Sequence, residues 1–69
     1  MERQAVRSSN LASIGYDPSS QILEVEFHGG RLYEFYDVPA SEYRALMNAS
    51  SHGKYFNANI KNNYNFKEL

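Results

Sequence analysis

The fold of this chain is decided by one stretch, Arg31-Leu32-Tyr33-Glu34-Phe35-Tyr36-Asp37-Val38-Pro39. Tyr33 and Phe35 occupy alternate positions, which is the pattern of a strand with one buried face. Pro39 ends this strand, and proline is tolerated in the first turn of a helix because its missing N–H would have no partner there. The stretch therefore predicts the last strand of a sheet, followed directly by a helix.

Two strands are predicted before this one. Apolar and polar residues alternate over residues 12–17 and again over residues 23–28, which is the period of a half-buried strand. The segment between them, Asp17-Pro18-Ser19-Ser20, is typical of a tight turn, because proline presets φ and the Asp side chain can cap the turn. The two segments therefore form a hairpin.

The turn before the aromatic strand should contain an odd number of residues. A two-residue loop at Gly29-Gly30 would place Val25 opposite Glu34 and mix the faces, because a slip of one residue inverts every side chain. A three-residue loop, His28-Gly29-Gly30, gives the correct faces and puts Gly30 where φ is positive. The exposed face of the sheet then carries three carboxylates, Glu24, Glu26 and Glu34.

Two helices are predicted after the sheet. The first begins near Pro39 and ends at Asn48-Ala49-Ser50, and its buried stripe has the i, i+3, i+4 spacing of Tyr43, Leu46 and Met47. The second is capped by one of the serines at 50–51 and continues through Lys61 or beyond. The predicted fold class is α+β, a three-stranded antiparallel β-meander followed by two short helices packed on one face of the sheet.

The chain should form one domain. A chain of 69 residues buries roughly 60% of its unfolded surface, which leaves no room for a second core. Residues 1–7 are polar and aperiodic, so we predict a flexible N-terminus before a single domain over residues 8–69. The predicted core contains Ile14, Tyr16, Leu23, Val25, Phe27, Tyr33, Phe35, Val38, Tyr43, Leu46, Met47, Phe56 and Ile60.

The composition excludes several classes of protein. The chain has no cysteine and only two histidines, His28 and His52, so neither a disulfide nor a thiolate site is possible and no metal or cofactor is expected. No segment approaches the roughly 18 apolar residues of a membrane span. No apolar region follows the charged N-terminus. We therefore expect a cytoplasmic protein with no membrane partner.

Charge is distributed unevenly, although the net charge is only −1. The acids Asp17, Glu24, Glu26, Glu34, Asp37 and Glu42 in the strand half accompany a single base, Arg31. The helical half from Tyr43 to Lys67 has no acid and contains the bases Arg44, Lys54, Lys61 and Lys67. Either the two halves neutralise each other within the fold, or the basic half forms a contact surface for nucleic acid.

Several blocks of the chain resemble a known family. They are Ser8-Ser9-Asn10, Ile14-Gly15-Tyr16-Asp17, Leu23-Glu24-Val25-Glu26-Phe27, Tyr33-x-Phe35, Val38-Pro39, Tyr43, and Gly53-x-Tyr55-Phe56-Asn57 with Ile60. Over about residues 8–64 the chain is similar to the KTSC domain, named after a C-terminal extension of some lysyl-tRNA synthetases and also found as small bacterial and phage proteins. The resemblance implies a domain of unestablished function for which RNA binding has been suggested.

One position departs from this family's pattern. The central motif of the family is usually Tyr-x-Tyr, whereas this chain has Phe35 as the second aromatic residue. A role that needs a hydroxyl group at that position therefore does not carry over to this chain. A packing role does carry over, because the ring is retained.

No group of residues in the sequence identifies a reaction. Ser8, Ser9, His28 and His52 are residue types found in hydrolases, but no nucleophile motif surrounds the serines. The three carboxylates of the sheet face could bind a cation, although exposed carboxylates on a solvated face are much commoner. We therefore predict a protein that is not an enzyme, with no catalytic residue and no metal site.

Two functional hypotheses follow from these observations. The first is a small binding domain that acts as a protein-interaction module or stand-alone adaptor, and the alternative is binding of RNA or single-stranded nucleic acid through the basic helical face. The candidate residues of that face are Arg44, Lys54, Tyr55, Asn57, Lys61, Asn62, Tyr64 and Lys67. The expected partner is an unknown protein or an RNA such as tRNA, and the protein itself is expected to be a monomer or weak homodimer.

Overall fold

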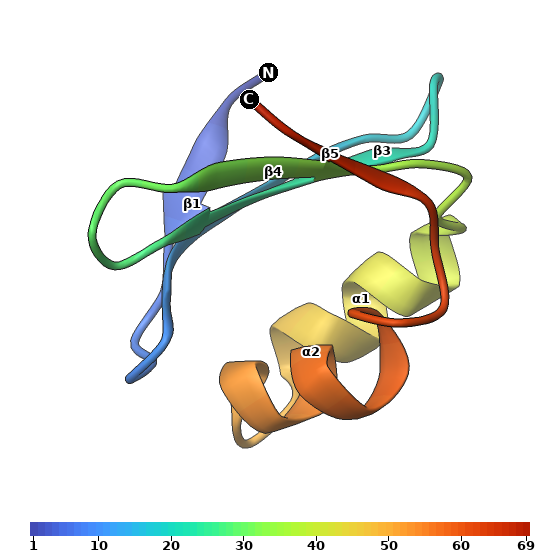
Figure 1. Ribbon diagram of the computed structural model, residues 1–69. Coiled ribbons are helices and arrows are strands. Elements are labelled where there is room, and N and C mark those ends of the chain that lie inside the picture. Colours follow the sequence, from blue (N-terminus) through green and yellow to red (C-terminus); the bar gives the residue numbers. More distant parts are fainter.

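The sheet has five antiparallel strands, and both helices lie against one of its faces (Figure 1). A computed structural model describes all residues, 1–69. The elements are β1 (Arg3–Ala5), β2 (Leu11–Asp17), β3 (Ile22–Phe27), β4 (Leu32–Phe35), α1 (Ala40–Asn48), α2 (His52–Asn59) and β5 (Phe66–Glu68). The strands follow the same order in the sheet as in the chain. The α+β class, with an antiparallel sheet and two helices, is therefore confirmed.

The predicted number of three strands was wrong, because the sheet has an additional short strand at each edge. β1 lies within residues 1–7, for which we predicted flexibility, and it places Gln4 opposite Ile14 of β2. β5 lies in the C-terminal tail and places Phe66 opposite Phe35 of β4. Each edge strand has three residues, which is too short for a period-two pattern to be recognised in the sequence.

The hairpin between β3 and β4 has the predicted register. Val25 lies opposite Tyr33 and Leu23 lies opposite Phe35, so the apolar faces of the two strands coincide. The connecting loop is closed by a hydrogen bond from the amide of Phe27 to the carbonyl of Arg31, at 2.8 Å. Both glycines of this loop have positive φ, 99° at residue 29 and 91° at residue 30, which explains the Gly-Gly pair.

A β-bulge in β2 changes which residues reach the core. The pairing of β2 with β3 shifts between Leu11 and Ser13, so an extra residue reverses the alternation at that point. Leu11 is fully buried, although the predicted core did not include it. The buried apolar residues are Leu11, Ile14, Leu23, Val25, Phe35, Val38, Leu46, Phe56 and Ile60. The other predicted core residues, Tyr16, Phe27, Tyr33, Tyr43 and Met47, are partly buried against them.

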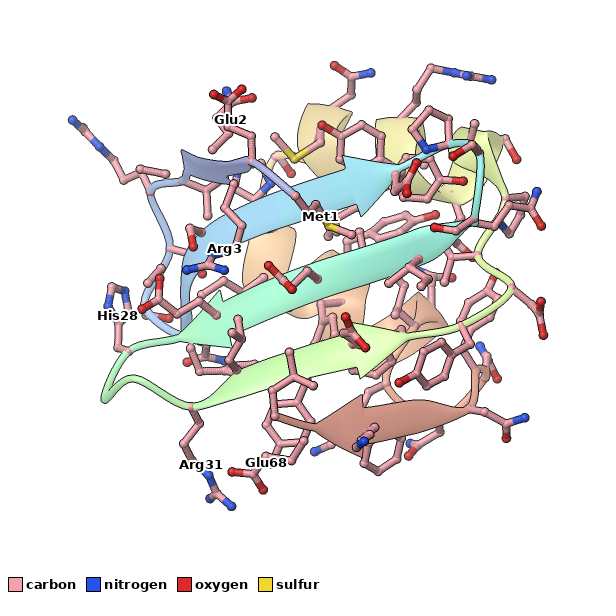
Figure 2. All side chains as sticks on the ribbon, turned by 90° about the horizontal axis from the view of Figure 1, so that it is seen from above. Met1, Glu2, Arg3, His28, Arg31 and Glu68 are labelled. Atoms are coloured by element: carbon pink, nitrogen blue, oxygen red, sulfur yellow. The ribbon has the colours of Figure 1, made fainter.

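The outer face of the sheet is less exposed than we predicted. Glu24 is only 8% exposed, because Arg3 of β1 crosses the face and donates a hydrogen bond from Nη1 to Glu24 Oε1 at 2.7 Å (Figure 2). Gly15 makes this crossing possible, since a Cβ atom there would lie 2.7 Å from the carbonyl oxygen of Glu2. The N-terminal segment therefore supplies the partner of a buried carboxylate.

The helices begin where the sequence predicted. Pro39 precedes α1, and the Ser51 side chain caps α2 by accepting a hydrogen bond from the amide of Lys54 at 3.2 Å. The expected continuation of α2 through Lys61 was wrong, because the helix ends at Asn59. At this end the carbonyl of Phe56 accepts hydrogen bonds from the amides of both Ile60 and Lys61, so the regular helical pattern stops. The asparagines near this point contribute, because asparagine favours turns over helix interiors. Neither helix is long and apolar enough to cross a membrane.

Candidate functional site

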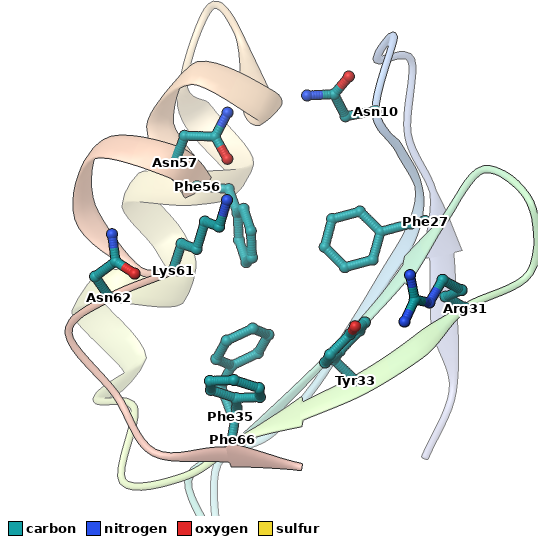
Figure 3. A pocket seen from close by; sticks show the side chains of 10 residues that line it. All are labelled: Asn10, Phe27, Arg31, Tyr33, Phe35, Phe56, Asn57, Lys61, Asn62 and Phe66. Atoms are coloured by element: carbon teal, nitrogen blue, oxygen red, sulfur yellow. The ribbon is translucent and has the colours of Figure 1, made fainter. Parts of the chain in front are cut away.

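A groove lies between the inner face of the sheet and the end of α2 (Figure 3). Its volume is about 520 Å³. Five aromatic rings form its walls and floor, namely Phe27, Tyr33, Phe35, Phe56 and Phe66. Amide and cationic side chains surround these rings, namely Asn10, Arg31, Asn57, Lys61 and Asn62. The groove is thus an aromatic surface with polar and positively charged groups at its margin.

The rings come from three neighbouring strands and one helix. Phe66 of β5 lies opposite Phe35 of β4, and their ring centroids are 5.7 Å apart. Phe56 of α2 meets Phe35 edge to face at 5.3 Å and Phe27 of β3 at 5.5 Å. Phe35 and Phe56 are almost fully buried, but Phe66 is 56% exposed. Phe66 is therefore the ring that is most accessible to a ligand.

The two cations of the groove differ in their partners. Lys61 is exposed and forms no salt bridge, whereas Arg31 donates from Nε to Glu68 Oε2 at 3.0 Å and from Nη2 to Oε1 at 3.1 Å. The hydrogen bond from Arg31 holds the pKa of the Glu68 carboxyl below its usual range, and the same contact raises the pKa of Arg31. Lys61 is therefore the cation that is free to meet an anion.

The Ser8-Ser9-Asn10 segment forms one margin of the groove, where Asn10 lies (Figure 3). Ser8 Oγ accepts hydrogen bonds from the amides of Asn10 and Leu11, both at 3.2 Å, which forms a tight turn. α2 packs closely on this turn at Gly53, where a Cβ atom would lie 3.3 Å from Ser8 Oγ and 3.5 Å from Asn10 Nδ2. The glycine therefore lets the helix approach the turn and holds Asn10 beside the groove.

The structure brings together three of the residues predicted for a nucleic-acid surface. Asn57, Lys61 and Asn62 line the groove, and all three are exposed. Arg44 and Lys54 are also exposed on α1 and α2, but they do not line the groove. The groove therefore holds only part of the basic helical face that the sequence predicts.

Tyr55 and Tyr64, two further residues of the predicted nucleic-acid surface, both donate hydrogen bonds to one carboxylate. The hydroxyl of Tyr64 donates to Glu42 Oε1 at 2.9 Å, and the hydroxyl of Tyr55 donates to Oε2 of the same residue. Burial and then this hydrogen bond raise the pKa of Tyr64 to about 12. Both rings pack partly buried against the core, and their shared contact with Glu42 joins the two helices to the C-terminal segment.

The remaining base of the predicted set lies on the other side of the sheet. Lys67 of β5 lies opposite Glu34 of β4 in the strand register. Its neighbour Phe66 points into the groove, so Lys67 points to the other face of the sheet. No salt bridge joins Arg44, Lys54, Lys61 or Lys67 to the acidic strand half, since the three ion pairs involve only Arg3 and Arg31. The bases of the helical half therefore do not neutralise the acids of the strand half through direct salt bridges.

Sequence reasoning missed Asn10, Arg31 and Phe66 as members of the site. We had assigned Tyr33 and Phe35 to packing, and the groove uses the same aromatic cluster. The missing information was β5, because Phe66 reaches the groove only when the tail forms a strand beside β4. The sequence carries no pattern that reveals this strand, because β5 has only three residues and a single apolar side chain.

The residues of a hydrolase triad are not assembled. His28 Nε2 lies 2.9 Å from the backbone carbonyl oxygen of Ser8, while Ser8 Oγ accepts from backbone amides. His52 Nδ1 lies 2.9 Å from the carbonyl oxygen of Leu46. Neither histidine contacts a serine hydroxyl as a general base would. No group of three or more His, Asp or Glu residues is placed to hold a metal ion.

The chain is similar in sequence to a small protein and to a segment of a much longer enzyme. An uncharacterised protein of Stutzerimonas stutzeri is 51% identical over 61 residues, which is 88% of this chain and 86% of that protein. A lysine–tRNA ligase of Nostoc sp. is 39% identical over 61 residues, which is 88% of this chain but 11% of the ligase. The chain therefore corresponds to a small part of the ligase and to most of the bacterial protein.

The fold and the family agree with these similarities. The crystal structure of a KTSC domain protein from Yersinia pestis covers 99% of this chain and 96% of its own, with a TM-score of 0.93 and 36% sequence identity. The family model of the KTSC domain matches residues 7–64, which confirms the resemblance found in the sequence. This chain belongs to the KTSC domain family.

Proposed function

We propose that this domain binds single-stranded RNA in the aromatic groove. The observation that carries the proposal is the position of Lys61, an unpaired cation at the margin of a groove whose most exposed ring is Phe66. A nucleotide needs both features, because its base stacks on an aromatic face and its phosphate requires a positive charge.

The groove residues have complementary roles in this proposal. A base lies against Phe66, and stacking of this kind contributes about 1–3 kcal/mol per base. The amides of Asn57 and Asn62 hydrogen-bond the base edge or the sugar, since Asn offers both donors and an acceptor. Lys61 contacts the adjoining phosphate.

Two further observations favour this face of the molecule and RNA as the ligand. On the outer face of the sheet, three carboxylates, Glu24, Glu26 and Glu34, outnumber the cations Arg3 and Lys67, and this excess of negative charge disfavours phosphates. A segment similar to this chain occurs in a lysine–tRNA ligase, an enzyme named for an RNA substrate. Both observations support the proposal that RNA binds on the helical side of the sheet.

The test compares two lysines with matched substitutions. Lys61→Gln should weaken binding of a short single-stranded RNA and reduce the slope of log K against log salt by about 0.7, the value for one lost phosphate contact. Lys54→Gln is the control, because it removes the same charge from an exposed residue outside the groove. Equal losses for the two variants would mean that only net charge matters, which would contradict the proposed site.

A protein-interaction module is the second candidate function. It is favoured by the exposed apolar residues at the C-terminal edge, where Phe66 is 56% and Leu69 is 55% exposed. Under this alternative an apolar side chain of a protein partner fills the groove, and binding changes little with salt because few charges are involved. The salt dependence of Kd for the bound ligand therefore separates the two functions.

A further inference from the structure

Glu68 of β5 contacts two residues that line the groove. Its carboxylate accepts the two hydrogen bonds from Arg31 at 3.0 and 3.1 Å, and Oε1 also accepts from the Tyr33 hydroxyl at 3.2 Å. Arg31 and Glu68 lie side by side at the end of the sheet (Figure 2). We infer that Glu68 sets the affinity of the groove for anions, by occupying Arg31 while the protein is free.

A phosphate and the Glu68 carboxylate compete for the same side of Arg31. A guanidinium group donates two parallel hydrogen bonds, and this fixed geometry fits either oxyanion. The side chains of Arg31 and Glu68 are 67% and 43% exposed, so a ligand in the groove can reach the pair. Ion pairs exposed to this extent are weak, so a phosphate can replace the carboxylate.

The groove therefore has one cation that can always bind an anion and a second that can do so only after its own carboxylate partner has moved away. Lys61 has no acidic partner, whereas Arg31 becomes available when Glu68 leaves it. The inference rests on the proposed function for the identity of the ligand, but the competition at Arg31 applies to any oxyanion. Glu68 lies beyond residue 64, where the match to the family ends, so this control resides outside the matched segment.

The test replaces Glu68 by Gln, which removes the charge and keeps the shape of the side chain. The matched control is Glu2→Gln, because Glu2 is exposed, forms no salt bridge and lies at the opposite edge of the sheet (Figure 2). For a single-stranded RNA heptamer at low salt, we expect Glu68→Gln to bind about three- to fivefold more tightly than wild type, as for the release of one exposed ion pair. We expect Glu2→Gln to change Kd by less than about twofold.

Removal of Arg31 completes the comparison. Arg31→Gln should weaken binding less in the wild-type background than in the Glu68→Gln background, because Glu68 competes for the guanidinium in wild type. In the Glu68→Gln background the same substitution should cancel the gain in affinity. Unchanged amide resonances of Lys67 would show that β5 remains paired in each variant. Equal gains in Glu68→Gln and Glu2→Gln, or a gain that persists without Arg31, would overturn the inference.

Inorganic phosphate separates this inference from the proposed function, since it carries no base. The Nε–H resonance of Arg31 should shift at lower phosphate concentration in Glu68→Gln than in wild type. If it does so while no variant binds RNA, the proposed function fails and the inference stands. If RNA binds every variant equally and the Arg31 resonance responds equally to phosphate, the inference fails and the proposed function stands.

Discussion

Phe35 and Phe66 lie opposite each other on β4 and β5, with ring centroids 5.7 Å apart, but only Phe35 is buried. Phe35 is 3% exposed, whereas Phe66 is 56% exposed. The same cluster of rings therefore forms core on one side and an accessible surface on the other. Substitutions of these two residues should separate stability from binding.

Phe35→Ala should destabilise the fold by about 3–5 kcal/mol, because it removes a large buried ring and leaves a cavity. A domain of 69 residues has little more stability than that to lose. Thermal unfolding followed by circular dichroism measures the effect. An unchanged midpoint would show that Phe35 does not support the core.

Phe66→Ala should cost only about 1 kcal/mol of stability, since roughly half of the ring already faces solvent. The same substitution should remove most of the affinity for single-stranded RNA, because the stacking surface is lost. Urea denaturation and an RNA titration on the same sample measure the two effects. A variant that unfolds as readily as Phe35→Ala, or binds RNA as well as wild type, would contradict these roles.

Gly15→Ala should destabilise the protein by about 1–3 kcal/mol, because the new Cβ atom would lie 2.7 Å from the backbone oxygen of Glu2. Displacement of this segment would also separate Arg3 from Glu24. The control introduces the same substitution into a chain that lacks residues 1–5. There the cost should disappear, and a cost of equal size in both chains would mean that Gly15 acts through something other than the N-terminal crossing.

Tyr64 should make stability fall at alkaline pH. Its pKa is raised to about 12 in the folded protein, above the value of about 10 for an exposed tyrosine. The folded state therefore holds this proton more tightly, so its contribution is complete below about pH 10 and is lost between about pH 10 and 12. Urea denaturation across this range measures the loss, and Tyr64→Phe should show a smaller one. Identical pH profiles would contradict the assignment.

The sequence was sufficient to predict the centre of the fold. The requirement that Tyr33 and Phe35 share a face with Val25 determined both the register and the length of the loop at residues 28–30. The start of each helix followed from Pro39 and from the capping serines. These features are local, so alternation, parity and capping were enough to find them.

The edges of the sheet, and with them the groove, could not be predicted in this way. β1 and β5 are ordered by pairing with residues distant in the chain, and neither has an apolar repeat of its own. The bulge that buries Leu11 also arises from pairing rather than from alternation. The sequence shows which bases the helical half contains, but their positions in space depend on where α2 ends. Only Lys61 of the four helical-half bases lines the groove.

The most direct test of the binding site is an NMR titration of ¹⁵N-labelled protein with tRNA and with short single-stranded RNA at low salt. The account predicts saturable shifts at Asn57, Lys61, Asn62 and Phe66, with little change on the outer face around Glu24. The shifts should decrease as salt rises, because phosphate contacts release counterions. No saturable shift with either RNA at low salt, or shifts centred on the outer face, would contradict RNA binding in the groove.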